Sequence, residues 1–274
     1  MRSIQFSTVP SPEILKRDVE CFRIIKYTGD EGSSIKVSPN GMPGIVFQHS
    51  NGQSAIENIS MASRIISTPT LFLYGLGTDP SIMNYKKGSY TTLQAIFKPH
   101  ALNTLLGLNA LALNGFAELN EFATEDLNLR LMEARNENEQ VALLTKFLVA
   151  KFEDARTRDT LIEEGLHLIH RNVSSITVKY LLEDLNISER QFERRFSQTV
   201  GLSPQSYIRV KRFNEAIRLM KTGQYERLTD IAYTLNFHDQ SHFIRDLKAF
   251  SGITPKSISQ KAQNYHDLGG FSYL

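Results

Sequence analysis

The first hundred residues consist of short apolar and β-branched runs separated by turns rich in glycine, asparagine and proline. Several runs alternate apolar with polar residues, which is the period of a half-buried strand. We expect strands at 21–27, 44–50, 63–69, 70–76 and 90–97. Five or more short strands at this spacing are typical of a small antiparallel barrel or sandwich, and a cupin-like barrel fits the same pattern.

The pattern changes to a helical period after Pro99. Helix-forming residues then recur without strand punctuation, and the clearest helix is expected at 136–152. One side of it carries Val141, Leu144, Leu148 and Phe152. This apolar stripe fits two arrangements, pairing with a second subunit or packing on the chain's own β-domain.

From about residue 160 the whole chain has the pattern of an all-helical domain. Helices are expected at 159–171, 176–185, 188–200, 204–221, 227–235 and 239–250, with a short one from 255. The fold class is therefore α+β and multidomain. We expect an N-terminal domain at 1–155, an all-α domain at 156–262, and a C-terminal tail at 263–274.

The helical domain contains the same pattern twice. Residues 188–207 align without gaps on 239–258, and 180–187 align on 230–237 at a spacing of fifty. Each copy is a short helix, a turn at Leu-Asn, and a second helix that ends at glycine before a Ser/Thr-Pro pair. This order predicts two helix-turn-helix units joined by a long helix at 203–223.

The individual residues of each copy have clear structural roles. Asn186 and Asn236 stand at the sharp turns, where asparagine tolerates left-handed backbone. Glycine is expected to end each second helix, and Ser-Pro or Thr-Pro to start the next. The residues with these roles are Gly201, Gly252, Ser203, Pro204, Thr254 and Pro255. Two apolar stripes are expected in the core, namely Phe192, Phe196 and Val200, and Phe243, Leu247 and Phe250.

The opposite face of each second helix is polar and basic. Arg190, Arg194 and Ser197 have the spacing of one helix face, and their repeat partners are Ser241, Arg245 and Lys248. Two such faces on a rigid connector fit successive major grooves about 34 Å apart. The connector's Arg209, Lys211 and Arg212 are equally suited to phosphate contact or to solvation of the helix.

Charge is distributed unevenly along the chain. Residues 1–150 carry 13 Lys+Arg and 14 Asp+Glu, whereas residues 165–260 carry 14 Lys+Arg and 9 Asp+Glu. The resulting net charge of +5 in the helical part fits an anionic polymer as partner, and equally a solvated basic surface. No apolar run is long enough to span a membrane, and the N-terminal stretch lacks the apolar core of a secretory signal, so we expect a cytoplasmic protein.

At these residues the sequence resembles the C-terminal DNA-binding domain of the AraC/XylS family of bacterial transcription regulators. The resemblance covers about 165–260 and is strongest at 230–258. It implies promoter recognition by two helix-turn-helix units, activation or repression of transcription, and double-stranded DNA and RNA polymerase as partners. It also implies an N-terminal domain that senses a small-molecule effector or forms a homodimer. Asn186 and Asn236 replace the glycine that is commoner in the family's turns.

Ten residues are the candidates for DNA contact. The second helix of each unit, at about 188–200 and 239–250, is the expected recognition helix. The candidates lie on its polar face or near its start, where base edges are usually reached. The candidates are Arg190, Gln191, Glu193, Arg194, Ser197, Gln240, Ser241, His242, Arg245 and Lys248. Arg194 and Arg245 are the foremost, as bidentate partners of guanine or as phosphate clamps.

The N-terminal half carries no specific chemical motif. His49 and His100 lack further ligands at metal spacing, so neither a metal nor another cofactor is expected, and no effector residues are assigned. The single cysteine, Cys21, is expected to be a buried packing residue. An enzyme with a cupin-like barrel would need clustered ligands or a nucleophile with its base, which the sequence lacks, so we expect no catalytic residues. An adaptor with degenerate helix-turn-helix units remains an alternative.

Overall fold

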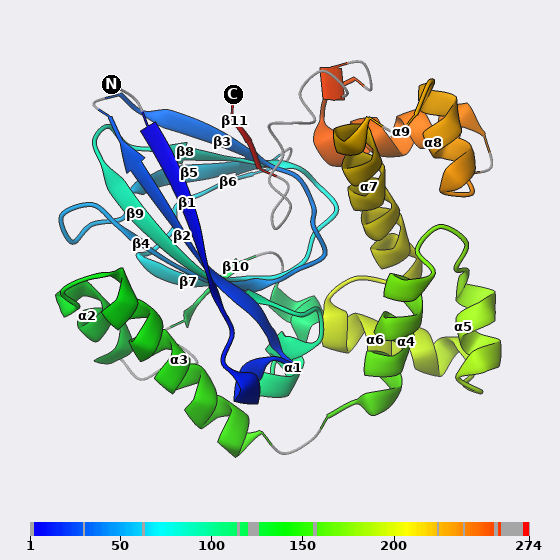
Figure 1. The fold of residues 1–274 in the computed structure, drawn as a ribbon. Coiled ribbons are helices and arrows are strands. Elements are labelled where there is room, and N and C mark those ends of the chain that lie inside the picture. The colour runs from blue at the N-terminus through cyan, green and yellow to red at the C-terminus, as the bar shows by residue number, and fades with distance from the viewer. Residues whose placement is uncertain are drawn as a thin grey trace.

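The computed structural model describes residues 3–29, 31–61, 64–113, 116–119, 126–155, 158–223, 225–237, 239–254, 257–258 and 271–273. Its N-terminal part is a two-sheet β-domain with helices along one side, and its C-terminal part is a separate group of helices (Figure 1). The α+β class and its order along the chain are thereby confirmed. None of the helices in the described part combines the length and the apolar composition needed to cross a membrane.

The two sheets are antiparallel and do not close into a barrel within the described residues. The larger has the order β1-β2-β9-β4-β7-β10 and the smaller the order β11-β3-β8-β5-β6. The strands of the larger sheet are β1 (Ser3–Pro10), β2 (Val19–Thr28), β4 (Gly44–His49), β7 (Leu71–Tyr74), β9 (Tyr90–Phe97) and β10 (Phe116–Glu118). Those of the smaller are β3 (Ser33–Val37), β5 (Ile56–Met61), β6 (Ile65–Ile66), β8 (Ser81–Tyr85) and β11 (Phe271–Tyr273).

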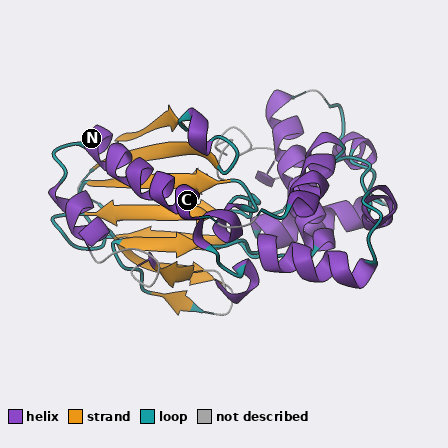
Figure 2. Ribbon diagram, turned by 90° about the horizontal axis from the view of Figure 1, so that it is seen from below, coloured by secondary structure: helices purple, strands orange, loops and turns teal. Residues whose placement is uncertain are grey.

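Helices cover the outer face of the larger sheet. They are η1 (Glu13–Leu15), α1 (Ala101–Leu106), η2 (Ala110–Leu113), α2 (Asp126–Glu133) and α3 (Glu137–Asp154). Figure 2 shows a long helix lying across the strands, with the helical domain beside the sheets. Val141, Leu144 and Leu148 of α3 are buried in the same core as Phe22, on β2. The sequence left open whether this stripe pairs with a second subunit or packs on the chain's own β-domain. In the structure it packs on the β-domain.

In the described part of the helical domain, six helices have bounds that match the expected ones within two residues. They are α4 (Thr160–Arg171), α5 (Val178–Asp184), α6 (Glu189–Val200), α7 (Pro204–Thr222), α8 (Leu228–Thr234) and α9 (Gln240–Ser251). Pro255 and most of the helix expected from residue 255 lie outside the described residues. Part of the tail expected at 263–274 forms β11, which pairs with β3 of the N-terminal domain.

Several strands were not apparent from the sequence. The sequence pattern did not predict β1, β3, β5 and β8, because these strands contain few consecutive apolar residues. Their partially exposed faces carry serine, threonine and asparagine. A second core nevertheless forms between the sheets, where Tyr85 and Tyr90 stack with ring centroids 4.1 Å apart. Cys21 is buried as expected, and burial raises the pKa of its thiol.

The two domains are joined by a buried ion pair. Asp18, whose side chain is fully buried, accepts two hydrogen bonds of 2.9 Å from Arg158, in the linker between α3 and α4. Arg158 also donates to Glu163 of α4 at 2.9 Å, and His100 Nε2 lies 3.2 Å from Asp18. Burial alone would raise the pKa of Asp18, but the hydrogen bonds from His100 and Arg158 outweigh it and hold that pKa below its usual value.

Replacing Asp18 with asparagine should destabilise the chain at neutral pH by roughly 3 kcal/mol, because Arg158 loses its buried partner. The pKa of Asp18 is lowered by folding, so its contribution is complete above the unfolded pKa, near 3.9. That contribution is lost as the pH falls through the lower, folded pKa. The difference between the denaturation midpoints of the two chains should therefore stay constant from pH 7 to about pH 4 and shrink below it. A difference that stays constant down to about pH 2 would contradict the assignment.

Candidate nucleic-acid interface

Each helix-turn-helix unit is a three-helix cluster with its own core. The first comprises α4, α5 and α6 with the start of α7, and the second the rest of α7 with α8 and α9. The 19-residue α7 is thus shared by both cores, and at about 28 Å it is long enough to hold the units apart. All six residues of the two expected apolar stripes are buried.

The turns have the backbone that the sequence predicts. Asn186 and Asn236 adopt left-handed backbone with φ of 47° and 53°. Gly201 and Gly252 follow α6 and α9 with φ of 90° and 65°, a region where a side chain would be strained. The Ser203 hydroxyl accepts a hydrogen bond from the Ser206 amide, which caps α7 ahead of Pro204.

Burial of the stripes leaves the polar faces of α6 and α9 outward. Eight of the ten candidate residues are exposed, and Ser197 and His242 are half-buried. Arg190, Glu193 and Arg194 line one shallow depression together with Glu189. Within each unit the structure therefore brings the candidates together on one outward face, and their contact with DNA stays a prediction.

Arginines in this domain fall into two groups. The side chains of Arg190, Arg194 and Arg245 have no ion pair within the described part of the chain, so their guanidinium groups are available to an outside anion. Arg195, by contrast, is held by two hydrogen bonds to Asp159, of 2.9 and 2.6 Å. Adjacent arginines on α6 thus differ in role, which the sequence alone did not distinguish.

In each unit an Arg–Asp ion pair holds the recognition helix. The helix supplies the arginine in the first unit and the aspartate in the second. In the first unit Arg195 of α6 binds Asp159, which also caps α4 through the Ile162 amide. In the second unit Asp246 of α9 accepts two hydrogen bonds from Arg209 of α7, of 3.1 and 2.6 Å. Positions 195 and 246 correspond at the repeat spacing of fifty-one, and their partners 159 and 209 lie fifty residues apart. Both ion pairs are bidentate, and the acidic and basic partners are exchanged between the units.

The basic residues of α7 make contacts within the protein that the sequence did not indicate. Arg209 binds Asp246, and Arg212 donates to the carbonyls of Val173 and Ile176 at 3.1 and 2.8 Å. The Lys211 side chain lies beside Gly41 of the N-terminal domain, and burial lowers its pKa. Arg209 and Arg212 thus have internal partners that the sequence did not indicate, and their contact with phosphates stays a prediction.

Two family models match the chain. Residues 181–261 match a family described as a helix-turn-helix domain, and residues 7–117 match one described as a domain of unknown function. Among curated relatives, the transcriptional activator RhaS of Citrobacter koseri is 22% identical over 205 residues, covering 74% of this chain and 70% of that protein. The activator AarP of Providencia stuartii is 27% identical over 112 residues, covering 40% and 82%.

The C-terminal domain is an AraC-type helix-turn-helix domain. Invasion protein InvF of Salmonella typhi matches over 97 residues at 27% identity, covering 35% of this chain and 44% of InvF, so the chain spans under half of that relative.

A solved structure of ToxT from Vibrio cholerae is similar at 13% identity, with coverage of 94% of this chain and 98% of that chain and a TM-score of 0.47. A probable AraC family regulator from Rhodopseudomonas palustris has 25% identity, coverage of 38% and 98%, and a TM-score of 0.35.

The two reversed ion pairs of the AraC-type domain should differ in strength. Replacing Arg209 with alanine leaves Asp246 charged at 2% side-chain exposure and should cost roughly 3 kcal/mol. Replacing Arg195 with alanine leaves Asp159 at 21% exposure, still bonded to a helix amide, and should cost below about 1 kcal/mol. Urea denaturation of the full chain, followed by circular dichroism, measures both.

The exchanged double variant, Arg209→Asp with Asp246→Arg, is the control, because it copies the polarity of the first unit. It should recover part of the stability that either single change loses. Equal costs for the two alanine variants, or no recovery in the exchange, would contradict the reversed-pair description.

Proposed function

We propose that this chain is a DNA-binding transcription regulator whose helices α6 and α9 enter successive major grooves of one duplex. The observation that carries the proposal is the pair of outward polar faces, with free arginines, on two units joined by one rigid helix. The AraC-type relatives are named as transcriptional activators, which supports activation as the outcome. RNA polymerase is then the partner at the promoter.

The ten candidate residues have three kinds of role in this proposal. Arg194 and Arg245 bind guanine edges or phosphates from the middle of each recognition helix. Residues near the helix starts, among them Gln191 and Gln240, reach base edges. Lys248, one turn beyond Arg245, neutralises the backbone.

The N-terminal domain supplies the regulatory input in this proposal. It holds a cavity of about 110 Å³ between its two sheets, lined by apolar and polar side chains, as expected of a small-molecule site. The apolar stripe of α3 is used internally, so dimerisation through that stripe is not part of the proposal.

Salt-dependent DNA binding tests the regulator. The full chain is titrated onto labelled duplex DNA at about 50 and 200 mM salt, and affinity should fall by about 10³ if some six phosphates are contacted. Arg194→Ala combined with Arg245→Ala should weaken binding by about a hundredfold, because two unpaired guanidinium groups are removed from the reading faces.

The matched control is Arg130→Ala combined with Arg135→Ala, which removes two exposed arginines of the N-terminal domain and should leave affinity unchanged. An unaltered affinity in the Arg194/Arg245 variant, with its circular dichroism intact, would refute the groove assignment. A wild-type chain that binds no DNA at low salt would favour the adaptor alternative.

A further inference from the structure

The cavity in the N-terminal domain has a polar floor. Cross-strand pairing puts Arg23 of β2, Gln94 of β9 and Val46 of β4 in one row on the inward face of the larger sheet. Arg23 and Gln94 are only 4% exposed, although a sheet interior normally holds apolar residues at such positions. These two polar residues interrupt the apolar pattern of the inward face.

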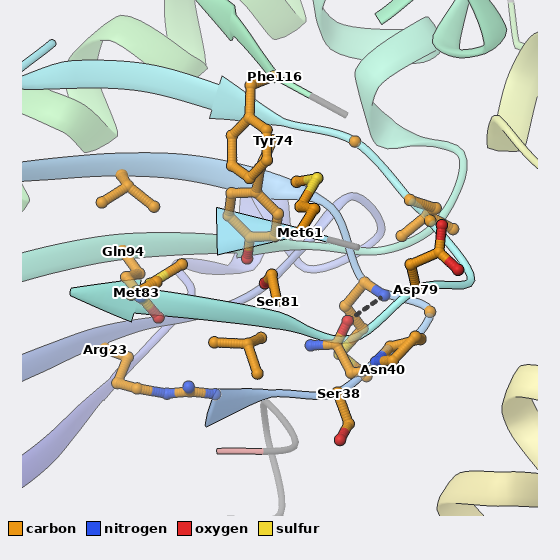
Figure 3. Close-up of a pocket in the computed structure, with 18 residues that line it drawn as sticks. Arg23, Ser38, Asn40, Met61, Tyr74, Asp79, Ser81, Met83, Gln94 and Phe116 are labelled. Carbon is orange, nitrogen blue, oxygen red and sulfur yellow. Dashed lines mark hydrogen bonds between the residues drawn. The ribbon is translucent and has the colours of Figure 1, made fainter. Parts of the chain in front are cut away.

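Further polar groups reach the same cavity from neighbouring strands. Tyr74 of β7 and Ser81 of β8 line it together with Gln94 (Figure 3). None of these three side chains hydrogen-bonds to a described residue, and Gln94 and Ser81 are at least nine-tenths buried. Burial raises the pKa of Tyr74 to about 12, so its phenol stays a neutral donor. A buried polar group without a partner is costly, and a ligand that bonds to it removes that cost.

The remaining lining is mainly apolar, with Ser38, Asn40 and Asp79 as its polar members. Met61, Met83, Leu76 and Phe116 surround the polar floor, and thioethers adapt their shape to what they pack against. Gly44, opposite Tyr74 in the β4–β7 ladder, leaves room for the phenol, because a Cβ there would lie 2.9 Å from its hydroxyl. The volume of about 110 Å³ is similar to cavities that accommodate a benzene-sized molecule.

One wall of the cavity is also part of the domain interface. Residues 38–42 line the cavity, and the carbonyl of Pro39 accepts a hydrogen bond of 3.1 Å from Asn214 of α7. Gly41 packs against Tyr207 and Lys211 of the same helix, with a φ of 73° that leaves a larger residue strained. Asn40 Oδ1 accepts from the Met42 amide, which closes this segment into a tight turn.

We propose that this cavity binds a compact, mainly apolar molecule with one hydrogen-bonding end, and that segment 38–42 transmits its presence to α7. The apolar body sits against the methionines, while Gln94, Tyr74 and Ser81 bond to the polar end. Because α7 is shared by both helix-turn-helix units, a shift of segment 38–42 changes the position of α7 and with it the orientation of the two units. This inference rests on the proposed regulator function and assigns its input site.

Binding of three probes to the full chain tests the ligand class. Benzyl alcohol and benzoate carry a polar end on a benzene ring, and toluene lacks it. At least one polar probe should bind about tenfold or more tightly than toluene in calorimetric or ligand-observed NMR titrations, because toluene leaves the polar floor unpaired. Gln94→Leu should abolish that preference, and Ser81→Ala should reduce it.

Gln140→Leu is the matched control, since Gln140 is equally buried but bonds to a carbonyl on α2, away from the cavity. It should leave the preference intact. The ligand class would be overturned if toluene bound as tightly as the polar probes or if no probe bound. It would also be overturned if both cavity variants folded and kept the preference for a polar probe.

Hydrogen exchange of the same chain tests the transmission. The bound polar probe should slow amide exchange in residues 37–47 and change it in α7. Asn214→Ala removes the bond to Pro39 and should leave probe affinity within about twofold while reducing the response in α7. Asn128→Ala, which removes the side-chain bond that Thr70, just before β7, donates to Asn128 of α2, should preserve that response.

An α7 response that persists in Asn214→Ala, or that never appears in the wild-type chain, would overturn the route. DNA binding without probe is measured in parallel. If DNA binding is intact and the probes fail, only the input site is wrong; if DNA binding itself is absent, the proposed function fails.

Discussion

Arg158 and Asp159, two consecutive linker residues, hold the first helix-turn-helix unit against the rest of the molecule. Arg158 binds the buried Asp18 of the N-terminal domain, and Asp159 caps α4 and holds Arg195 of α6. A carboxylate as deeply buried as Asp18 requires its cation, so this junction resists separation of the two domains. Helix α6 and its following glycine also lie against α1 and η2, with Gly201 close to the carbonyl of Ala110. The orientation of one recognition helix is therefore a property of the whole chain.

The second unit is connected differently. Its recognition helix is held by Arg209 and Asp246, both within the AraC-type domain, and among the described elements it shares α7 with the first unit. Segment 38–42 contacts that shared helix, as the bond between Pro39 and Asn214 shows. In the proposed mechanism a ligand does not need to reach the DNA-binding faces. It needs only to shift the contact between segment 38–42 and α7, the helix that joins the two units.

Much of the reading domain was predictable from the sequence because its determinants are local. The repeat, the asparagine turns and the glycine stops specify helix ends within a few residues, and the apolar stripes specify which face is buried. The outward face then follows by elimination. What escaped prediction was the fate of individual arginines. Arg194 and Arg195 are neighbours in the sequence, yet one is free and the other bonded, because only Arg195 faces Asp159 across a separation of 36 residues.

The sequence by itself determined the order of the domains, the two helix-turn-helix units and the face each presents, since helical periodicity and turn chemistry act over a few residues. Only the tertiary structure decided the pairing of Arg23 with Gln94 across strands, the cavity they floor, and the contact between residues 38–42 and α7. Strand pairing and domain docking join residues far apart in the chain. Their register depends on the packing of the whole molecule, which no local pattern encodes.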